Sequence, residues 1–516
     1  MSGQEQHNTP KPVSSPLRSS AHGLFKQPPS GTAEFDEDKA KEVIQSFSDE
    51  MVPRMLLSVE RRQTARIGEG EDFTSYYTVT KGVYVKMSVV RAEPALGDQI
   101  MKCDHWEGNQ IVKDAPALEG APNFRRIPGT ILFGVGQPSY EGLYRMKQIL
   151  SSGKHVDYSS ETAANDISSM ADAGADQQSR PDRGHHSSNL KESGLRKEMT
   201  MDDGAFNRLV WINLREEPVI YIDGIPYAPR DRSTLNVNLE HLIGIEGYDL
   251  EKMEQRLKAD ITAKAKAEEN KIEIVRQNEK MENVRETLTY TPGTIFTPKE
   301  IYTRIGEIIP VQYARVPITD ECAPQERDFE ELVFLLKDLV LITNSSITDT
   351  KVAVIFNCQM GRGRTTTGIV CAYLIMYVHT THLENSLLEQ WKNVEKKQRD
   401  GVDYNDGHYT VIKQLVSLLP NGEYIKYQVD KAIDACSQVQ NLREAINECR
   451  EIWLKGGKDA QKYHARGINY LERYWWLIVF NAYLAEEAPV GFKQSFPEWM
   501  KGRWGFKRLL KKLELQ

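Results

Sequence analysis

The residues best suited to chemistry lie in one short segment, from Cys358 to Arg364. Two of the five residues between the cysteine and the arginine are glycines, and Thr365 follows the arginine directly. A cysteine thiolate is a strong nucleophile, and the planar fork of an arginine can hold two oxygens of one phosphoryl group. The residue types and their spacing therefore predict a loop that binds phosphate and attacks phosphorus through sulfur, giving a phosphocysteine intermediate.

The neighbouring sequence predicts the two elements that would hold this loop. An apolar strand is expected over Val352–Phe356, and a buried helix is expected over Thr365–Val378. A loop between a strand and a helix N-terminus can point successive backbone N–H groups at an anion, and the helix end adds partial positive charge. Arg364 is the expected clamp on the phosphate. The other residues expected to bind the substrate are Gln359, Met360, Gly361, Arg362, Gly363 and Thr365.

A nucleotide-binding loop of the Walker type is the nearest alternative, because it also joins a strand to a helix. Such a loop requires a lysine after its second key glycine, whereas here Arg364 follows Gly363 and the glycine spacing differs. A purely structural cysteine would not account for the Gly-Arg-Gly-Arg run beside Cys358. The other five cysteines lack an arginine six residues further on and are interpreted as structural.

Hydrolysis of a phosphate ester also requires an acid that protonates the leaving oxygen. Asp320 is the best candidate, because it lies in an expected loop after an expected strand, Val311–Val316, and 38 residues before Cys358. An aspartate in a Thr-Asp-Glu sequence can equally cap a helix. The residues alone leave both roles open.

Strand and helix patterns alternate around these residues, which predicts an α/β fold with a parallel sheet and helices on both faces. A capping box at Thr297 with Pro298 at the first helical position marks the start of one helix. The other expected strands cover 209–214 and 219–222, and the other expected helices cover 248–270 and 329–341.

Composition divides the chain into parts. Residues 1–36 are rich in Ser, Pro, Gly and Gln and are expected to be a disordered tail. Residues 37–119 are an N-terminal region of uncertain fold, with β structure expected near 76–90, and residues 120–424 are expected to form the α/β domain. A polar tract, 151–204, is expected to be a disordered insertion in it, since surface loops tolerate added length. Residues 425–516 are expected to be helical, with aromatic residues forming core.

Charge and composition exclude several classes of protein. The chain of 516 residues has a net charge of −7 and no basic tract, which argues against general nucleic-acid binding. Its longest strongly apolar stretch, Tyr474–Ala485, is shorter than the roughly 20 residues needed to span a bilayer. No apolar signal core begins the sequence, and six scattered cysteines fit a reducing compartment, so a cytoplasmic protein is expected. His185–His186 lacks a third ligand at metal-binding spacing, and no metal is expected.

The loop Asn357–Gly368 resembles that of paladin and the protein-tyrosine-phosphatase-like inositol polyphosphatases, the cysteine phytases. The resemblance covers roughly residues 95 to 516, and it implies a protein-tyrosine-phosphatase-like fold without a cofactor. It also implies Cys358 as nucleophile, Arg364 as phosphate clamp and Asp320 as acid. Other segments that agree are Asn123–Arg126, Gly134–Ser139, Trp211–Glu217 and Ile318–Glu321.

Two departures from the family pattern are visible. The residue before the nucleophile is Asn357 where these enzymes usually have histidine, and one copy of the motif is present where members usually carry two or three. The expected function is a phosphatase acting on inositol polyphosphates, with Arg362, Arg230 and Arg232 as a basic pocket. The alternatives are a tyrosine or dual-specificity phosphoprotein phosphatase and a phosphate-binding pseudophosphatase that serves as a signalling scaffold.

Overall fold

The computed structural model of the chain describes residues 99–105, 118–152, 205–339, 351–378, 383–394 and 403–516. Single positions are left out at 237, 240, 241, 243, 279, 281, 307 and 308. The expectations for the tail 1–36, for β structure near 76–90 and for the insertion beyond residue 152 lie outside the described residues.

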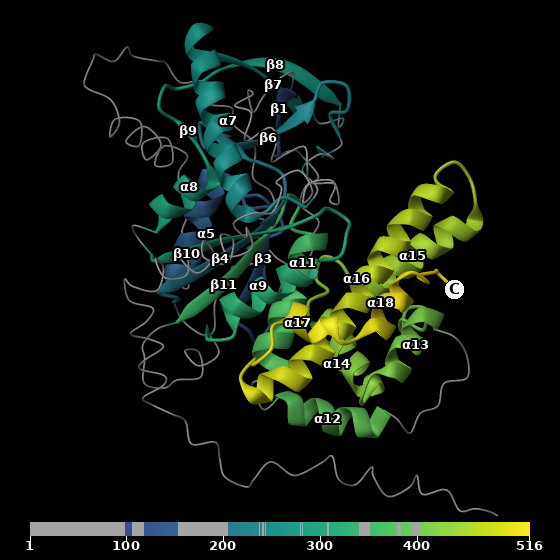
Figure 1. The fold of residues 1–516 in the computed structure, drawn as a ribbon. Helices are drawn as coiled ribbons and strands as arrows, with labels where there is room; N and C mark the ends of the chain where they lie inside the picture. Colours follow the sequence, from purple (N-terminus) through teal and green to yellow (C-terminus); the bar gives the residue numbers. More distant parts are fainter. Residues whose placement is uncertain are drawn as a thin grey trace, which may run out of the picture.

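A five-stranded sheet forms the centre of the fold, in the order β10-β4-β11-β3-β2 (Figure 1). Its first four strands are parallel and β2 is antiparallel to β3, which confirms the expected α/β class. The expected strands of this sheet are all present. Their bounds are β2 Arg125–Arg126, β3 Leu132–Val135, β4 Arg208–Arg215, β10 Val311–Ile318 and β11 Val352–Asn357.

Both faces of this sheet are covered, which explains why β11 is apolar from Val352 to Phe356. Val352, Val354 and Phe356 belong to one hydrophobic core, whereas Ala353 and Ile355 belong to the other. On the second core lie α5 (Tyr140–Ser152) and α8 (Pro298–Ile305), and α8 begins with the expected capping box. On the first core lie α9 (Glu326–Leu336), α11 (Gly363–Tyr373) and the π-helical turn η2 (Leu374–Val378) that continues α11.

A second sheet, which the sequence analysis did not predict, has six strands in the order β8-β7-β1-β6-β5-β9. It is antiparallel except for the pairing of β1 with β7. One of its strands, β5, corresponds to the strand expected over 219–222. Two hairpins, β5–β6 and β7–β8, are joined by the long-range pairings of β1 with β6 and β7 and of β5 with β9, which no local pattern indicates. The bounds are β1 Gln99–Cys103, β5 Ile220–Ile222, β6 Ile225–Asp231, β7 Lys271–Gln277, β8 Asn283–Thr289 and β9 Ile295–Phe296, with α7 (Gly247–Ala267) packed on the sheet.

The C-terminal part of the chain is helical, as expected, but the helices begin at Thr410 and not at residue 425. They share one hydrophobic core with the five-stranded sheet. Phe329 of α9 packs its ring 4.7 Å from that of Phe480. Four residues of the expected aromatic stripe of α16 are fully buried, namely Tyr474, Trp475, Phe480 and Tyr483, and Tyr470 is partly buried. The helices are α12 Leu383–Val394, α13 Thr410–Leu418, α14 Gly422–Ala435, α15 Leu442–Lys455, α16 Ala460–Glu487, the 3-10 turn η3 Ala488–Val490, α17 Phe496–Lys501 and α18 Trp504–Leu510.

Within the described ranges, we find no helix that combines the length and apolarity needed to cross a bilayer.

Candidate active site

The residues singled out from the sequence converge at one edge of the five-stranded sheet. Cys358 follows β11, Asp320 lies two residues after β10, and Glu217 lies two residues after β4. Since these strands are parallel, their carboxyl ends meet at the same edge, where α/β sheets place their ligand sites. The topology of the sheet thus brings together side chains that are far apart in the sequence.

The loop after β11 is held by hydrogen bonds to its carbonyl oxygens. The Gln137 N–H donates to Gln359 O at 2.8 Å, and Asn123 Nδ2 donates to Met360 O at 2.8 Å. Buried Arg125 donates from Nη1 to Gly361 O at 2.9 Å. Three successive carbonyl groups are therefore turned toward β2 and β3, away from the centre of the loop.

The opposite side of the loop presents N–H groups. Among the described residues, no acceptor pairs with the backbone N–H groups of residues 359–365. Gly361 has a φ of +72°, and a Cβ there would collide with the backbone of Gly136. This position accepts only glycine without strain. These N–H groups at the start of α11 are therefore available to a ligand, and such groups at a helix N-terminus favour an anion.

Cys358 directly precedes these N–H groups in the chain, and its side chain is 3% exposed. Thr365 is fully buried and its Oγ1 has no hydrogen-bond partner among the described residues. Asn357, which precedes Cys358, accepts from Trp211 Nε1 at 2.8 Å and donates to Gln137 Oε1 at 3.3 Å. The amide thus links β11 to β4 and to the residues that follow β3.

Arg364 lies in the first turn of α11 and is oriented by two carboxylates. Its Nη1 donates to Glu217 Oε1 at 2.8 Å, and its Nε lies 3.2 Å from Asp320 Oδ1. Burial opposes the charged form of Arg364, but Asp320 and Glu217 outweigh burial and raise the pKa of the guanidinium. Arg364 is therefore a fixed cation directed at the loop.

Glu217 belongs to a buried chain of charges that the sequence analysis did not single out. Arg215 Nε donates to Glu217 Oε2 at 3.0 Å, and Arg215 Nη1 donates to Asp104 Oδ2 at 2.5 Å. Burial alone would raise the pKa of Glu217, but Arg364, Arg215 and Arg230 hold it below its ordinary value. Removing one member would leave its partner as an uncompensated buried charge, so the chain fixes the position of Arg364.

Two side-chain hydrogen bonds hold the loop that carries Asp320. Thr319 Oγ1 donates to Glu216 Oε1 at 3.0 Å, and burial raises the pKa of Glu216 to about 7. Asn238 Nδ2 donates to Asp320 Oδ2 at 3.2 Å, and the Asp320 side chain is 47% exposed. The carboxyl group of Asp320 is thus accessible to solvent while it contacts Asn238 and Arg364.

Arg473 of α16 is the residue that sequence reasoning missed completely. Its Nε and Nη2 donate to Cys322 O at 3.2 and 2.9 Å, two residues beyond Asp320. Its Nη1 lies 3.3 Å from the position that a Cβ at Gly363 would occupy. This buried arginine therefore contacts two loops: residues 319–322, here called the acid loop, and residues 358–364, here called the phosphate loop. A charged residue within the buried aromatic stripe of α16 was the one available signal.

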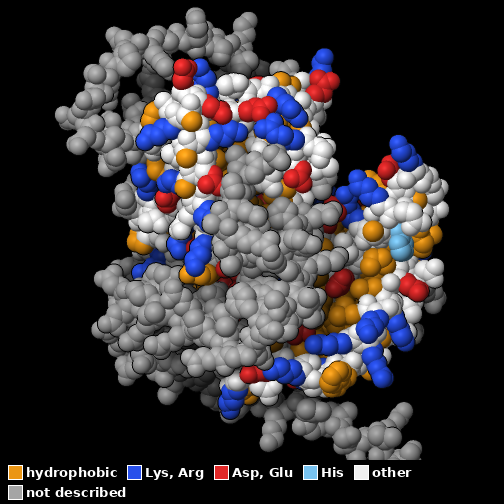
Figure 2. Space-filling model, turned by 45° about the horizontal axis from the view of Figure 1, so that its top comes forward, with side chains coloured by type: hydrophobic (Ala, Val, Ile, Leu, Met, Phe, Trp, Pro, Cys, Tyr) orange, Lys and Arg blue, Asp and Glu red, His pale blue; other side chains and the backbone are white. Residues whose placement is uncertain are grey.

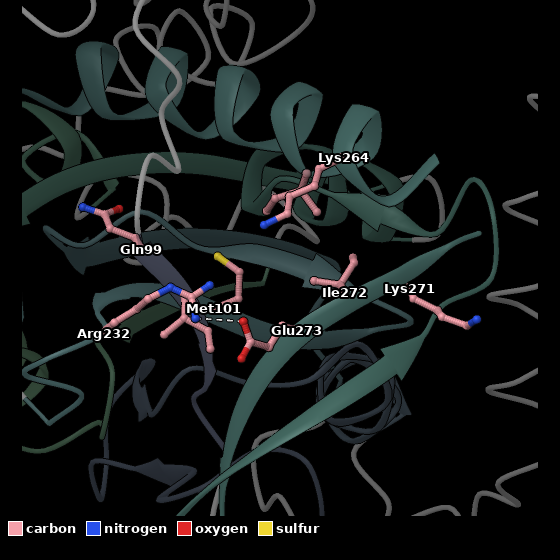
Figure 3. Close-up of a pocket in the computed structure, with 9 residues that line it drawn as sticks. Gln99, Met101, Arg232, Lys264, Lys271, Ile272 and Glu273 are labelled. Atoms are coloured by element: carbon pink, nitrogen blue, oxygen red, sulfur yellow. Dashed lines mark hydrogen bonds and ion pairs between the residues drawn. The ribbon is translucent and has the colours of Figure 1, made fainter. Parts of the chain in front are cut away.

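The expected basic pocket is only partly present. Arg362 is exposed, and Arg230 is buried close enough to Asp104, Glu217 and Arg364 to interact with their charges. Arg232 is a correction: it lies in the turn directly after β6, pairs with Glu273 at 2.8 Å and lines a small pocket under α7 (Figure 3). The strand ends at Asp231, so the alternation along β6 that directs Arg230 does not extend to Arg232. The Gln359 side chain donates from Nε2 to Asp104 Oδ1 at 3.1 Å.

One comparison with known proteins is a family model for protein-tyrosine-phosphatase-like phytases, whose description reads inositol hexakisphosphate. It matches residues 212–376, about a third of the chain. The matched range contains Asp320, Cys358 and Arg364, whose geometry is described above.

The chain is also similar to vertebrate paladins. Paladin of Danio rerio is 28% identical over 415 residues, covering 77% of this chain and 41% of its own length. Paladin of Xenopus tropicalis is 28% identical over 400 residues (74% and 38%), and that of Homo sapiens is 26% identical over 399 residues (74% and 39%). The chain spans about two fifths of the length of these relatives.

Solved structures with a detectable likeness include two phytases. The tandemly repeated PTP-like phytase of Mitsuokella multacida is 14% identical with a TM-score of 0.38, covering 81% of this chain and 52% of that one. The PTP-like phytase of Bdellovibrio bacteriovorus is 14% identical with a TM-score of 0.36, covering 79% and 96%. The PTP-like myo-inositol phosphatase of M. multacida, solved with myo-inositol-(1,3,4,5)-tetrakisphosphate, is 13% identical with a TM-score of 0.38, covering 81% and 52%.

Proposed function

We propose that this chain is a cysteine-dependent phosphatase that hydrolyses phosphate monoesters of inositol polyphosphates. One observation carries the proposal: the carbonyl groups of Gln359, Met360 and Gly361 are tied back, which leaves a row of N–H donors around Cys358. Such a row is suited to a tetrahedral oxyanion. The match of residues 212–376 to PTP-like phytases supports the same substrate class.

The reaction then has two steps. The Cys358 sulfur attacks phosphorus, a P–S bond forms, and the ester P–O bond breaks as Asp320 donates a proton to the leaving oxygen. Water next attacks the phosphocysteine while Asp320 takes up a proton from it, which releases inorganic phosphate and restores the thiolate. Arg364 and the loop N–H groups hold the phosphoryl oxygens in both steps, where they stabilise the charge of the transition state. Six free cysteines support a reducing compartment such as the cytoplasm, where the nucleophile stays reduced.

A second candidate function is phosphate binding without turnover, for a scaffolding role. Asn357 favours it, because a neutral amide bonded to Trp211 and Gln137 stands where phosphatases of this type usually have histidine. Release of inorganic phosphate from inositol hexakisphosphate and from a phosphotyrosine peptide separates the candidates. Phosphate release from the inositol compound supports the first proposal, and tight binding without release from either supports the second.

Replacement of Arg362 by alanine tests the substrate class. Arg362 is an exposed residue of the loop. Arg362 and Arg466 both lie close enough to Cys449 to influence its charge, and Arg466 pairs with Glu321 at 2.7 Å. A second phosphate group on an inositol ring can bind Arg362 and Arg466, whereas a phosphotyrosine has no second phosphate group. We expect kcat/KM for inositol hexakisphosphate to fall at least about tenfold, about 1.4 kcal/mol, with a much smaller change for the peptide.

Arg232→Ala is the matched control, since it also removes an arginine that is accessible to solvent, but one that follows β6 and pairs with Glu273. It should leave both substrates unaffected. The selective loss in Arg362→Ala should also shrink at high salt, because exposed charges are screened. Equal losses on both substrates in Arg362→Ala would contradict an inositol polyphosphate specificity and point to a general defect of the loop.

Replacement of Arg473 by glutamine tests whether α16 contributes to the site. The amide cannot form both hydrogen bonds to Cys322 O, and it removes a cation beside Gly363. We expect kcat/KM to fall about tenfold on every substrate, about 1.4 kcal/mol, because the acid loop and the phosphate loop lose a common support. Thermal melting separates this from unfolding, and Arg473→Lys should recover part of the activity. Unchanged kinetics in a folded Arg473→Gln variant would exclude the role.

A further inference from the structure

Residues 501–512 carry a concentration of positive charge that the proposed reaction does not use. Six basic side chains stand against one acidic side chain, Glu514, between residues 501 and 516, which gives 6 − 1 = +5 in a chain of net charge −7. Arg503 and Lys507 are committed to ion pairs with Glu486 and Glu326. Arg508, Lys511 and Lys512 are exposed and have no ion-pair partner among the described residues.

A large apolar side chain stands among these charges. Trp504 is 76% exposed, the highest value among the large hydrophobic residues of the described ranges. It is the first residue of α18, which is anchored by buried Phe506 and Leu509. Leu418 is 53% exposed and lies next to α18, 3.7 Å from an ideal Cβ at Gly505. Trp504 is therefore held outward by a well-packed helix and has a second exposed apolar side chain nearby.

We propose that Trp504, Leu418, Arg508, Lys511 and Lys512, here called the basic patch, dock the chain on an anionic lipid surface. We choose a lipid surface as the partner because of charge complementarity. Clusters of lysine and arginine are attracted to acidic headgroups, and tryptophan enters the interfacial layer between headgroups and acyl chains. On the face drawn in Figure 2, hydrophobic and basic side chains lie exposed side by side over the helical part of the chain.

Other partners fit the patch less well. The core of a protein interface is apolar and depleted in charged residues. The patch offers only Trp504 and Leu418 as apolar area and surrounds them with basic side chains. Single-stranded nucleic acid is bound by several aromatic side chains on which bases stack, and the patch has one. The proposal does not depend on phosphatase activity. The ion pair of Lys507 with Glu326 nevertheless places α18 at the start of α9, the helix that follows the acid loop.

Sedimentation of the full chain with lipid vesicles tests the proposal. We expect binding to vesicles of equal parts phosphatidylserine and phosphatidylcholine, none to phosphatidylcholine alone, and weakening with added salt. Trp504→Ala and the double variant Lys511→Glu/Lys512→Glu should each weaken binding about tenfold or more, while the melting temperature stays unchanged because these side chains are exposed.

Leu454 and its neighbours provide a matched control, since Leu454 is 57% exposed and Lys455 and Lys458 are exposed beside it. Leu454→Ala and Lys455→Glu/Lys458→Glu should bind vesicles like the unchanged chain. The proposal is overturned by an absence of binding to the anionic vesicles, by equal binding to neutral ones, or by equal losses in patch and control variants. Binding of an RNA oligonucleotide that needs the patch, without vesicle binding, would also overturn it and assign the patch to polyanions.

Discussion

Replacement of Cys358 by serine is expected to abolish release of inorganic phosphate from inositol hexakisphosphate while the chain still binds it. Serine keeps the shape of the loop, whose N–H groups are positioned by the carbonyl bonds to Gln137, Asn123 and Arg125. A neutral hydroxyl is a poor nucleophile where no base stands ready to take its proton. We expect kcat to fall at least about a thousandfold. Colorimetric phosphate detection measures turnover, and titration calorimetry measures binding.

The control for this variant is Cys322→Ser. Cys322 lies next to the site, but its backbone carbonyl and not its sulfur holds Arg473, so activity should persist. Retained turnover in Cys358→Ser would rule out the phosphocysteine intermediate. Loss of both turnover and binding in that variant would mean that the thiol group is required for the loop to form, and this outcome would leave the nucleophile unassigned.

Asp320→Asn is expected to slow hydrolysis according to the leaving group. An amide cannot donate the proton that an alkoxide needs, and general acid catalysis contributes roughly 10²- to 10⁴-fold. We expect kcat for inositol hexakisphosphate to fall by about 10²-fold or more. For an aryl phosphate with an acidic phenol as leaving group, such as p-nitrophenyl phosphate, the loss should be a few-fold, because that group departs without a proton.

Asp320 also lies 3.2 Å from Arg364 Nε, so its loss could disturb the phosphate clamp as well. Such a disturbance would affect both substrates alike, which is why the ratio between them is the informative quantity. Glu321→Gln is the matched control, since it converts the neighbouring carboxylate to an amide and breaks the pair with Arg466. An equal loss on both substrates in Asp320→Asn would make Asp320 a positioning residue.

The amino-acid sequence by itself determined the features that depend on neighbouring residues. The phosphate loop could be recognised because its nucleophile, glycines and arginine lie within seven residues, from Cys358 to Arg364. The strand β11 was evident because both of its faces are buried, which makes the residues from Val352 to Phe356 apolar. The start of α8 was evident because the capping box at Thr297 is formed by residues three apart.

The tertiary structure alone decided what orients these residues, because the contacts join positions that no local pattern connects. Arg364 meets Glu217 across 147 residues, Arg473 meets Cys322 across 151, and Arg125 meets Gly361 across 236. Glu217, Arg473 and Arg125 look like ordinary surface residues in the sequence, since burial and partner are set only when the strands align and the helices pack. The same reason explains why the second sheet was missed and why Arg232, which follows the end of β6, pairs with Glu273 and does not join the site.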